Sequence, residues 1–242
     1  MNERMEYNPY AFARPKVRPC GEKARDPYDG LRPWSAITHG MGAALGVLGT
    51  VLLLWRVAAL NQGGAAFGAF LLYGLSMIGL YTASTLYHCL RTGVKGRIAL
   101  RKYDHISIYF LIAGSYTPIC ALMLVQDGGI PMLAAVWTVA LAGTALAVAW
   151  ISAPRWLTSA IYLLMGWMAL FLLPGLLRNM PVEGMLWLVL GGVLYTVGGV
   201  LYAVKWPGRN NPRFGCHEIF HVFILLGSVA HFFLMYRVVA IS

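Results

Sequence analysis

The chain has 242 residues, of which 59% are hydrophobic and only 12% are charged, and its mean hydropathy is +0.64. Soluble domains are typically about 45–50% apolar, so this composition excludes a soluble globular protein and indicates a chain that crosses a membrane several times. The net charge of +10 does not predict a nucleic-acid partner. The basic residues lie between hydrophobic segments, where membrane orientation and anionic lipid headgroups account for them.

Residues 1–33 form a polar, basic tail interrupted by prolines, and we expect a cytoplasmic arm that contacts the inner leaflet. No apolar core followed by a small-residue cleavage site occurs there, so no cleaved signal peptide is predicted. The four cysteines are scattered and form no CxxC motif. Their spacing argues against a disulfide framework.

Seven apolar segments follow the tail, each of about 20 residues and therefore long enough to cross a hydrocarbon core. Pro118 interrupts the third segment and is expected to bend it, whereas Gly42 and Gly46 are expected to allow close helix packing in the first. The sequence therefore predicts an all-α, seven-transmembrane-helix domain over residues 34–242. The predicted spans are Trp34–Ala59, Ala65–Leu90, Asp104–Val125, Ile130–Ile151, Trp156–Leu177, Gly184–Val204 and Phe214–Val239.

The basic residues are distributed unevenly between alternate loops. Sixteen of the nineteen lie in the tail and in the second–third, fourth–fifth and sixth–seventh loops, and the other three are Arg56, Arg178 and Arg237. The positive-inside rule therefore predicts a multi-pass plasma-membrane protein with its N-terminus in the cytoplasm and its C-terminus outside.

Polar side chains from three spans are predicted to lie at one membrane level. Ser84 and His88 end the second span, Asp104 opens the third, and His217 and His221 occupy the first two turns of the seventh. Residues four apart share a helix face, and three imidazoles with an open fourth position are typical of catalytic zinc. Asp104 is the predicted general base, and Ser84 is expected to hold it or to polarise a substrate carbonyl.

Each of these residues also has a purely structural interpretation. His88 and Ser84 could hydrogen-bond to neighbouring helices, and Asp104 could interact with the dipole at a helix start. Their common level favours the metal site. His39 lies at the same level and could support it, whereas His231 is expected to be a packed polar residue nearer the outer half.

The motif His-Glu-x-x-His at residues 217–221 also matches an intramembrane metalloprotease, in which Glu218 would be the base. Such a site needs a third ligand. Asp127 lies on the predicted outer side, whereas His88 and Asp104 lie at the level of the motif. We therefore favour Asp104 over Glu218 as the base.

The chain contains the motifs Thr38-His39-Gly40, Ser84-x-x-x-His88, Asp104, Ala113-Gly-Ser-Tyr-Thr-Pro118, Gly166-Trp167 and His217-x-x-x-His221. This series resembles the hemolysin III family, the bacterial branch of the progestin and adiponectin receptor family, over the whole region after the tail. The resemblance implies a zinc ion bound by His88, His217 and His221, with Asp104 and Ser84 completing the site. The wider superfamily, which includes alkaline ceramidases, implies membrane hydrolases that act on lipid amides.

Several functions are compatible with these features. The first is a zinc-dependent membrane lipid hydrolase, and the second is a zinc-stabilised membrane-homeostasis sensor without turnover. A cytolysin is less favoured, because a water-filled pore needs polar residues through the whole membrane depth. Membrane lipids are the predicted partners, nucleic acid is not, and the sequence carries no signal for an oligomeric state.

Overall fold

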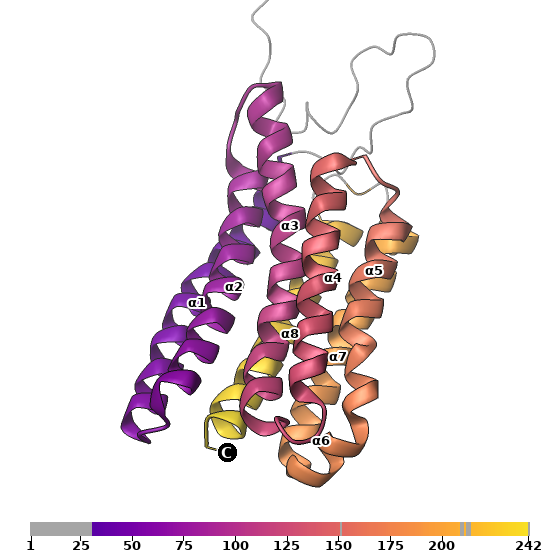
Figure 1. Cartoon of the computed structure of the whole chain (residues 1–242). Helices are drawn as coiled ribbons and strands as arrows, with labels where there is room; N and C mark the ends of the chain where they lie inside the picture. Colours follow the sequence, from indigo (N-terminus) through magenta and orange to yellow (C-terminus); the bar gives the residue numbers. More distant parts are fainter. Residues whose placement is uncertain (1–30, 151, 209–210, 212–213, 242) are drawn as a thin grey trace, which may run out of the picture.

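The computed structural model describes residues 31–150, 152–208, 211 and 214–241, so most of the predicted tail lies outside them. These residues form helices and no β-strand, and Figure 1 shows a bundle of long helices that run roughly alongside one another. In chain order the elements are α1 (Pro33–Ala59), α2 (Gly63–Cys89), α3 (Val94–Pro118), the π-helix η1 (Ile119–Met123), α4 (Gly129–Ala149), α5 (Arg155–Trp167), the 3₁₀ helix η2 (Met168–Leu172), α6 (Leu173–Asn179), α7 (Val182–Val204), α8 (Cys216–Arg237) and the 3₁₀ helix η3 (Val239–Ile241).

Seven segments in the described part of the chain are long and apolar enough to cross a membrane, and α5, η2 and α6 together make the fifth. The prediction of an all-α, seven-span protein is therefore confirmed. In lipid every backbone polar group needs a partner within the protein, which an α-helix supplies along its whole length.

The third helix begins earlier than predicted. It starts at Val94, well before the expected start at Asp104, because the basic residues of this segment made it look like a loop. Arg97 is nevertheless buried. Its guanidinium donates to the carbonyl of Tyr87 and lies over the Tyr87 ring, 3.8 Å from the centroid. This cation–π contact stabilises the additional turns of α3 against the end of α2.

The bundle has two ends, which we name by the direction of α8. At the proximal end α1, α3, α5 and α8 begin, and at the distal end α2, α4 and α7 begin. The C-terminus lies at the distal end, at the bottom of Figure 1. There Arg178 forms an ion pair with Asp127, and Arg237 Nε lies 2.5 Å from a carboxylate oxygen of Glu183.

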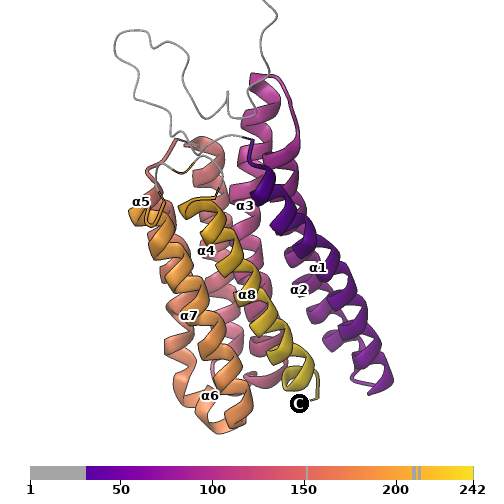
Figure 2. The same cartoon turned by 180° about the vertical axis from the view of Figure 1, so that it is seen from behind.

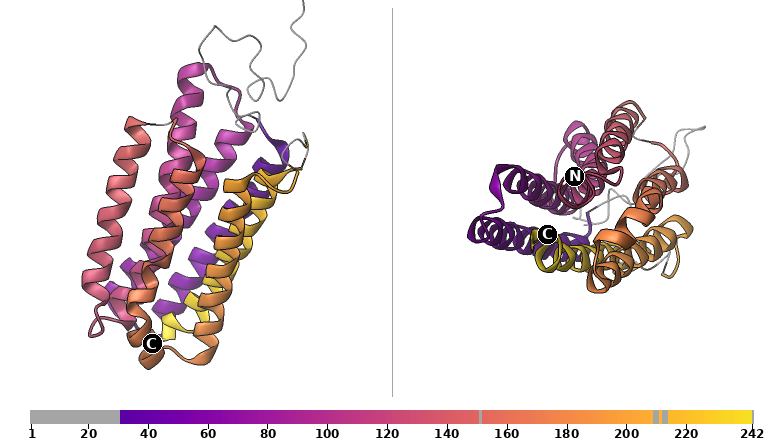
Figure 3. Two further views of the ribbon diagram at one scale, coloured as in Figure 1. Left: turned by 90° about the vertical axis from the view of Figure 1, so that its right-hand side faces the viewer. Right: turned by 60° about the horizontal axis from the view of Figure 1, so that its bottom comes forward.

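Contacts between helices close the bundle into a ring. The order of neighbours is α1, α2, α3, α4, α5, α7, α8 and back to α1, and Figures 2 and 3 show α8 between α1 and α7. Gly42 allows α1 to approach α2 closely, because a Cβ at this position would lie 2.5 Å from Cδ1 of Tyr81. Contacts between α1 and α8 bring the first and last spans together on one side of the ring.

Two spans depart from regular α-helix. The α-helical pattern of the third span ends at Pro118 and continues as the π-helix η1. Proline lacks an N–H and so removes one donor from the helical ladder, and π segments accompany such interruptions. The fifth span changes to 3₁₀ geometry at η2 before it resumes as α6.

Candidate metal centre

Two helices far apart in the sequence bring three histidines together at the proximal end. His88 lies in the last turn of α2, and His217 and His221 lie in the first two turns of α8, on one face. The N–H of Gly215 donates to Oε2 of Glu218 at 2.8 Å, which caps the start of α8. This cap fixes the turn that carries His217 and therefore the direction of its side chain.

The three imidazoles form one compact, buried cluster. Nε2 of His217 lies 3.1 Å from Nε2 of His88, and one ligand nitrogen from each of the three rings lies within 4.8 Å of the others. Two nitrogens that bind one tetrahedral ion at about 2.0–2.1 Å are about 3.4 Å apart. The cluster therefore has dimensions compatible with a bound metal ion.

His39 of α1 packs directly against this cluster. Its ring stacks on that of His221, with centroids 3.6 Å apart and an interplanar angle of 17°, and it meets the Tyr81 ring edge-on at 5.0 Å. Both ring nitrogens of His39 are buried, and the ring interacts with the backbone of His221 without a hydrogen bond of normal geometry to a described residue. The stacking restricts rotation of the His221 ring, and His39 lies outside the three-histidine group.

A cavity of about 300 Å³ extends from the cluster along the bundle toward the distal end. His217 and His221 line its proximal part together with Ser84 of α2 and Asp104 of α3. Ser84 is buried and Asp104 is half-buried. The structure thus brings the predicted hydroxyl and carboxylate onto the wall of the same cavity as the histidines.

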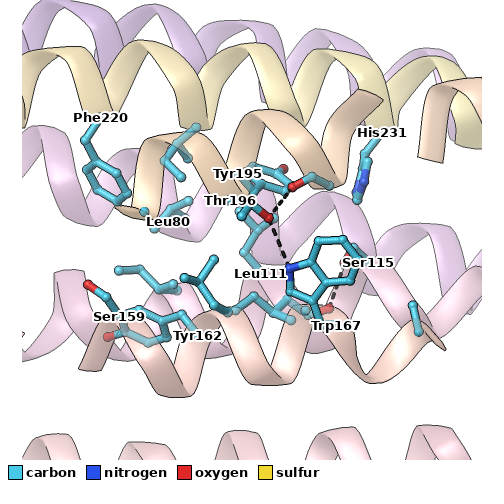
Figure 4. Close-up of a pocket in the computed structure, with 18 of the residues that line it drawn as sticks. Leu80, Leu111, Ser115, Ser159, Tyr162, Trp167, Tyr195, Thr196, Phe220 and His231 are labelled. Carbon is cyan, nitrogen blue, oxygen red and sulfur yellow. Dashed lines mark hydrogen bonds between the residues drawn. The ribbon is translucent and has the colours of Figure 1, made fainter. Parts of the chain in front are cut away.

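The rest of the cavity wall is mainly apolar and aromatic. Side chains from α2, α3, α5, α7 and α8 contribute to it, and Figure 4 shows them facing one another across the space between the helices. The labelled residues include Leu80, Leu111, Tyr162, Trp167 and Phe220. An elongated apolar cavity with a polar end is suited to an amphipathic ligand.

Glu218, the base of the alternative protease interpretation, already has hydrogen-bond donors on both carboxylate oxygens. Arg32 and Ser35 donate to Oε1, the latter at 3.2 Å, and the N–H of Gly215 donates to Oε2. Among the described residues, the lining of the cavity does not include Glu218. These contacts favour a structural role for this carboxylate.

Arg32 is the main residue of this region that sequence reasoning missed. It was assigned to the polar tail, yet it is only 4% exposed and forms a buried ion pair with Glu218. Its backbone N–H also donates to the carbonyl of His88 at 3.0 Å. Glu218 could have predicted a buried basic residue nearby, because a carboxylate within an apolar helix requires a cationic partner.

A second polar group lies farther along α8. The hydroxyl of Tyr81 donates to Oγ of Ser228 at 2.7 Å, and the hydroxyl of Tyr195 lies 2.9 Å from the same oxygen. The three hydroxyls connect α2, α7 and α8, and we call them the hydroxyl cluster. His231 packs edge-on against Tyr195 and, beyond the packing role predicted for it, also lines the cavity.

Comparisons with known proteins agree with the motifs found in the sequence. The Haemolysin-III related family matches residues 33–232. A Hemolysin-3 homolog of Bacillus subtilis (strain 168) is 36% identical over 200 residues, which cover 82% of this chain and 90% of that protein. Hemolysin-3 of Bacillus cereus is 34% identical over 199 residues, which cover 82% and 87%.

A more distant similarity links the chain to eukaryotic receptors. The ADIPOR-like receptor IZH2 of Saccharomyces cerevisiae (strain ATCC 204508 / S288c) is 36% identical over 50 residues, which cover 19% of this chain and 16% of that protein. Together with the seven apolar helices, the matches over most of the chain identify a multi-pass protein of the plasma membrane. The chain belongs to the Haemolysin-III related family.

Proposed function

We propose that this protein is a membrane hydrolase that cleaves lipid amides with the help of a zinc ion bound by His88, His217 and His221. The observation that carries the proposal is the convergence of these three buried imidazoles, two of which, His217 and His221, lie on the wall at the polar end of a long apolar cavity. An amphipathic lipid placed in that cavity would present its amide at the histidines and its chain to the apolar wall.

The chemistry of the donor set supports zinc as the metal. Three neutral imidazoles are a ligand set used by catalytic zinc sites, which keep a fourth position open. Thiolates are the preferred ligands of structural zinc. The nearest cysteines, Cys89 and Cys216, adjoin His88 and His217, and adjacent helical positions point about 100° apart. A site of three imidazoles with access to the cavity is therefore the catalytic type.

When bound, zinc would polarise the amide carbonyl and lower the pKa of a water molecule to about 7. The Asp104 carboxylate would accept a proton from that water and then transfer it to the nitrogen of the departing amine. The net reaction consumes one water and releases a carboxylate and an amine. Oγ of Ser84 would donate a hydrogen bond to the carbonyl oxygen as negative charge develops there.

The hydrogen bonds that the Glu218 carboxylate already accepts support Asp104 as the base. A general base must have an oxygen within reach of the proton that it accepts. Both oxygens of Glu218 accept hydrogen bonds from protein groups, whereas Asp104 lines the cavity itself.

A sensor without turnover is the second candidate. It is favoured by the position of the histidines, because a metal ion there would join α2 to the start of α8. In that case removal of zinc would loosen the fold, and the pure protein would consume no lipid amide.

Zinc content and amide hydrolysis, measured on the same purified variants, distinguish these functions. Replacing any one of His88, His217 or His221 by alanine is expected to remove most of the bound zinc. Asp104→Asn is expected to keep the metal and lose hydrolysis, because an amide cannot accept the proton. Ser84→Ala is expected to lower affinity or activity by about 10–100-fold.

Cys89→Ser is the matched control for the histidine variants. Cys89 is exposed and adjoins His88, and the variant should retain full zinc. If His88→Ala also retains full zinc while the two α8 variants lose it, α2 is not part of the site and the proposed architecture is wrong. Zinc-loaded wild type that hydrolyses no lipid amide would favour the sensor.

A further inference from the structure

The first turn of α1 contacts both helices that carry the three-histidine cluster. Arg32 is the N-cap residue of α1, and its backbone N–H donates to the carbonyl of His88 at 3.0 Å. Its guanidinium donates to Oε1 of Glu218 on α8, and Oγ of Ser35 donates to the same oxygen at 3.2 Å. Arg32, Ser35 and Glu218 are all buried. Arg32 therefore joins the end of α2 to the start of α8.

The order of helices in the ring gives this connection its effect on the histidines. α1 lies between α8 and α2 in the ring, and Figure 2 shows α1 and α2 on one side of α8. His88 belongs to α2, whereas His217 and His221 belong to α8. The hydroxyl cluster joins these helices farther along the bundle. At the level of the histidines, their separation depends on how Arg32 holds the two helix ends.

The start of α1 also contacts the third histidine. His39 stacks on the His221 ring, and the same ring interacts with the backbone of Ser35, without a hydrogen bond of normal geometry at Nδ1. Metal-binding histidines usually present their second nitrogen to a carbonyl or carboxylate, which fixes the orientation of the ring. The Ser35 backbone is placed to do this for His221. The first two turns of α1 thus contact residues of the cluster on both helices.

A buried ion pair at this position has a further role besides stability. Removal of two charges from water costs free energy that their attraction often fails to offset, and apolar replacements of similar size are often as stable. The cap of α8 uses one carboxylate oxygen, since the Gly215 N–H donates to Oε2 of Glu218. The other oxygen accepts from Arg32 of α1. One attested use of such pairs is to specify a single arrangement of the elements that they join.

We propose that Arg32 is a positioning residue for metal binding, which holds His88 at the correct distance from the two histidines of α8 and so raises the affinity of the cluster for zinc. This inference rests on the proposed function, in which zinc is the ion that the cluster binds. Arg32 contacts the backbone of one ligand residue and the cap of the helix that carries the other two, so it acts through them. Loss of such supporting contacts typically lowers metal affinity about 10–100-fold.

The charge of Arg32 acts on zinc in the opposite direction. A guanidinium near the cluster repels a divalent cation. If Arg32 acted on the site only through its charge, its removal would tighten zinc binding. If it positions the histidines, its removal weakens zinc binding in spite of the lost repulsion.

The zinc affinity of the purified protein in detergent, measured by competition with a chromophoric chelator, tests this role. Replacing both Arg32 and Glu218 with methionine removes the ion pair without a change in net charge. The zinc dissociation constant of this variant should rise about 10–100-fold. The Tm of its metal-free form should stay at or above that of wild type, because such a replacement is often neutral or stabilising. Bound Co²⁺, whose visible absorption depends on coordination geometry, should give a changed spectrum.

Arg32→Gln is the second variant, which decides the question if the double variant does not fold. It removes one positive charge and shortens the side chain that joins α1 to Glu218, so its zinc dissociation constant should rise although the repulsion is lost. The matched control replaces both Arg237 and Glu183 with methionine. This change removes an ion pair at the distal end and should leave zinc affinity unchanged.

Unchanged or tighter zinc binding in the folded variants, or an unchanged Co²⁺ spectrum, would overturn the positioning role. A loss of affinity that the control shares would overturn it too. Weaker zinc binding together with a lower Tm of the metal-free double variant would assign Arg32 to stability alone.

The proposed function fails in a different measurement. Wild type that binds zinc but hydrolyses no lipid amide would refute the hydrolase, and weaker zinc binding in the Arg32 variants would still establish the positioning role. Wild type without affinity for zinc would refute both.

Discussion

Replacing Glu218 by glutamine tests whether this carboxylate has a structural or a catalytic role. The substitution keeps the size of the side chain and an oxygen that can accept the Gly215 N–H, but it removes the charge that faces Arg32. Loss of one partner from a buried ion pair typically costs about 3–5 kcal/mol of unfolding free energy. At about 2–4 °C per kcal/mol for a chain of this size, we expect Tm to fall by about 6–20 °C.

The assay is thermal unfolding of the purified protein in detergent, combined with amide hydrolysis well below the transition. Asp104→Asn makes the same chemical change on the cavity wall, where the carboxylate is only half-buried. That variant should lose less unfolding free energy than Glu218→Gln, because its carboxylate is less buried, and it should lose hydrolysis, whereas Glu218→Gln should lose stability and keep turnover while folded.

A double substitution checks the physical cause. Replacing both Arg32 and Glu218 with methionine removes both buried charges, which is often neutral or stabilising, so Tm should recover relative to Glu218→Gln. The reasoning is refuted if Glu218→Gln has wild-type stability and no turnover while Asp104→Asn remains active. In that case Glu218 is the base.

Two further predictions concern other parts of the bundle. Hydrogen bonds from Arg178 and Asn179 hold the pKa of the Asp127 carboxyl below its usual value of 3.8. Its contribution to stability is therefore complete above about pH 4 and is lost as pH falls through the lowered pKa, and Asp127→Asn should flatten the acid limb of a plot of Tm against pH. Ser228→Ala deprives the hydroxyls of Tyr81, which is buried, and Tyr195, which is half-buried, of their shared partner and should cost about 1–3 kcal/mol, measured by thermal unfolding against a Ser115→Ala reference. A Ser228→Ala variant as stable as that reference would show that the hydroxyl cluster does not stabilise the bundle.

The sequence was sufficient for the seven spans and for the convergence of the three histidines. Apolar length defines spans directly, and alternate crossing places the end of α2 beside the start of α8. The i, i+4 spacing of His217 and His221 then puts both rings on one face. These inferences need only chain direction and helix periodicity.

Pairings between distant residues required the structure. The ion pair of Arg32 with Glu218 joins positions 186 residues apart, and no local pattern selects one partner among many arginines. The sequence also predicted a loop over the first turns of α3, because these turns are rich in basic residues. In the structure, the contact between Arg97 and Tyr87 stabilises the buried charge within a helix. The stacking of His39 on His221 likewise depends on how α1 packs beside α8.

If the protein cleaves lipid amides as proposed, the placement of the three histidines at one end of the bundle limits which lipids it can use. A bilayer presents different headgroups on its two faces, and a headgroup crosses the hydrocarbon core only at a high desolvation cost. Under the proposed function, a cavity whose polar end lies at the proximal end would therefore receive lipids from the leaflet on that side. With the orientation predicted from the basic loops, that is the inner leaflet, so the rate of turnover in a cell would follow the transbilayer asymmetry of the lipid as well as its total amount.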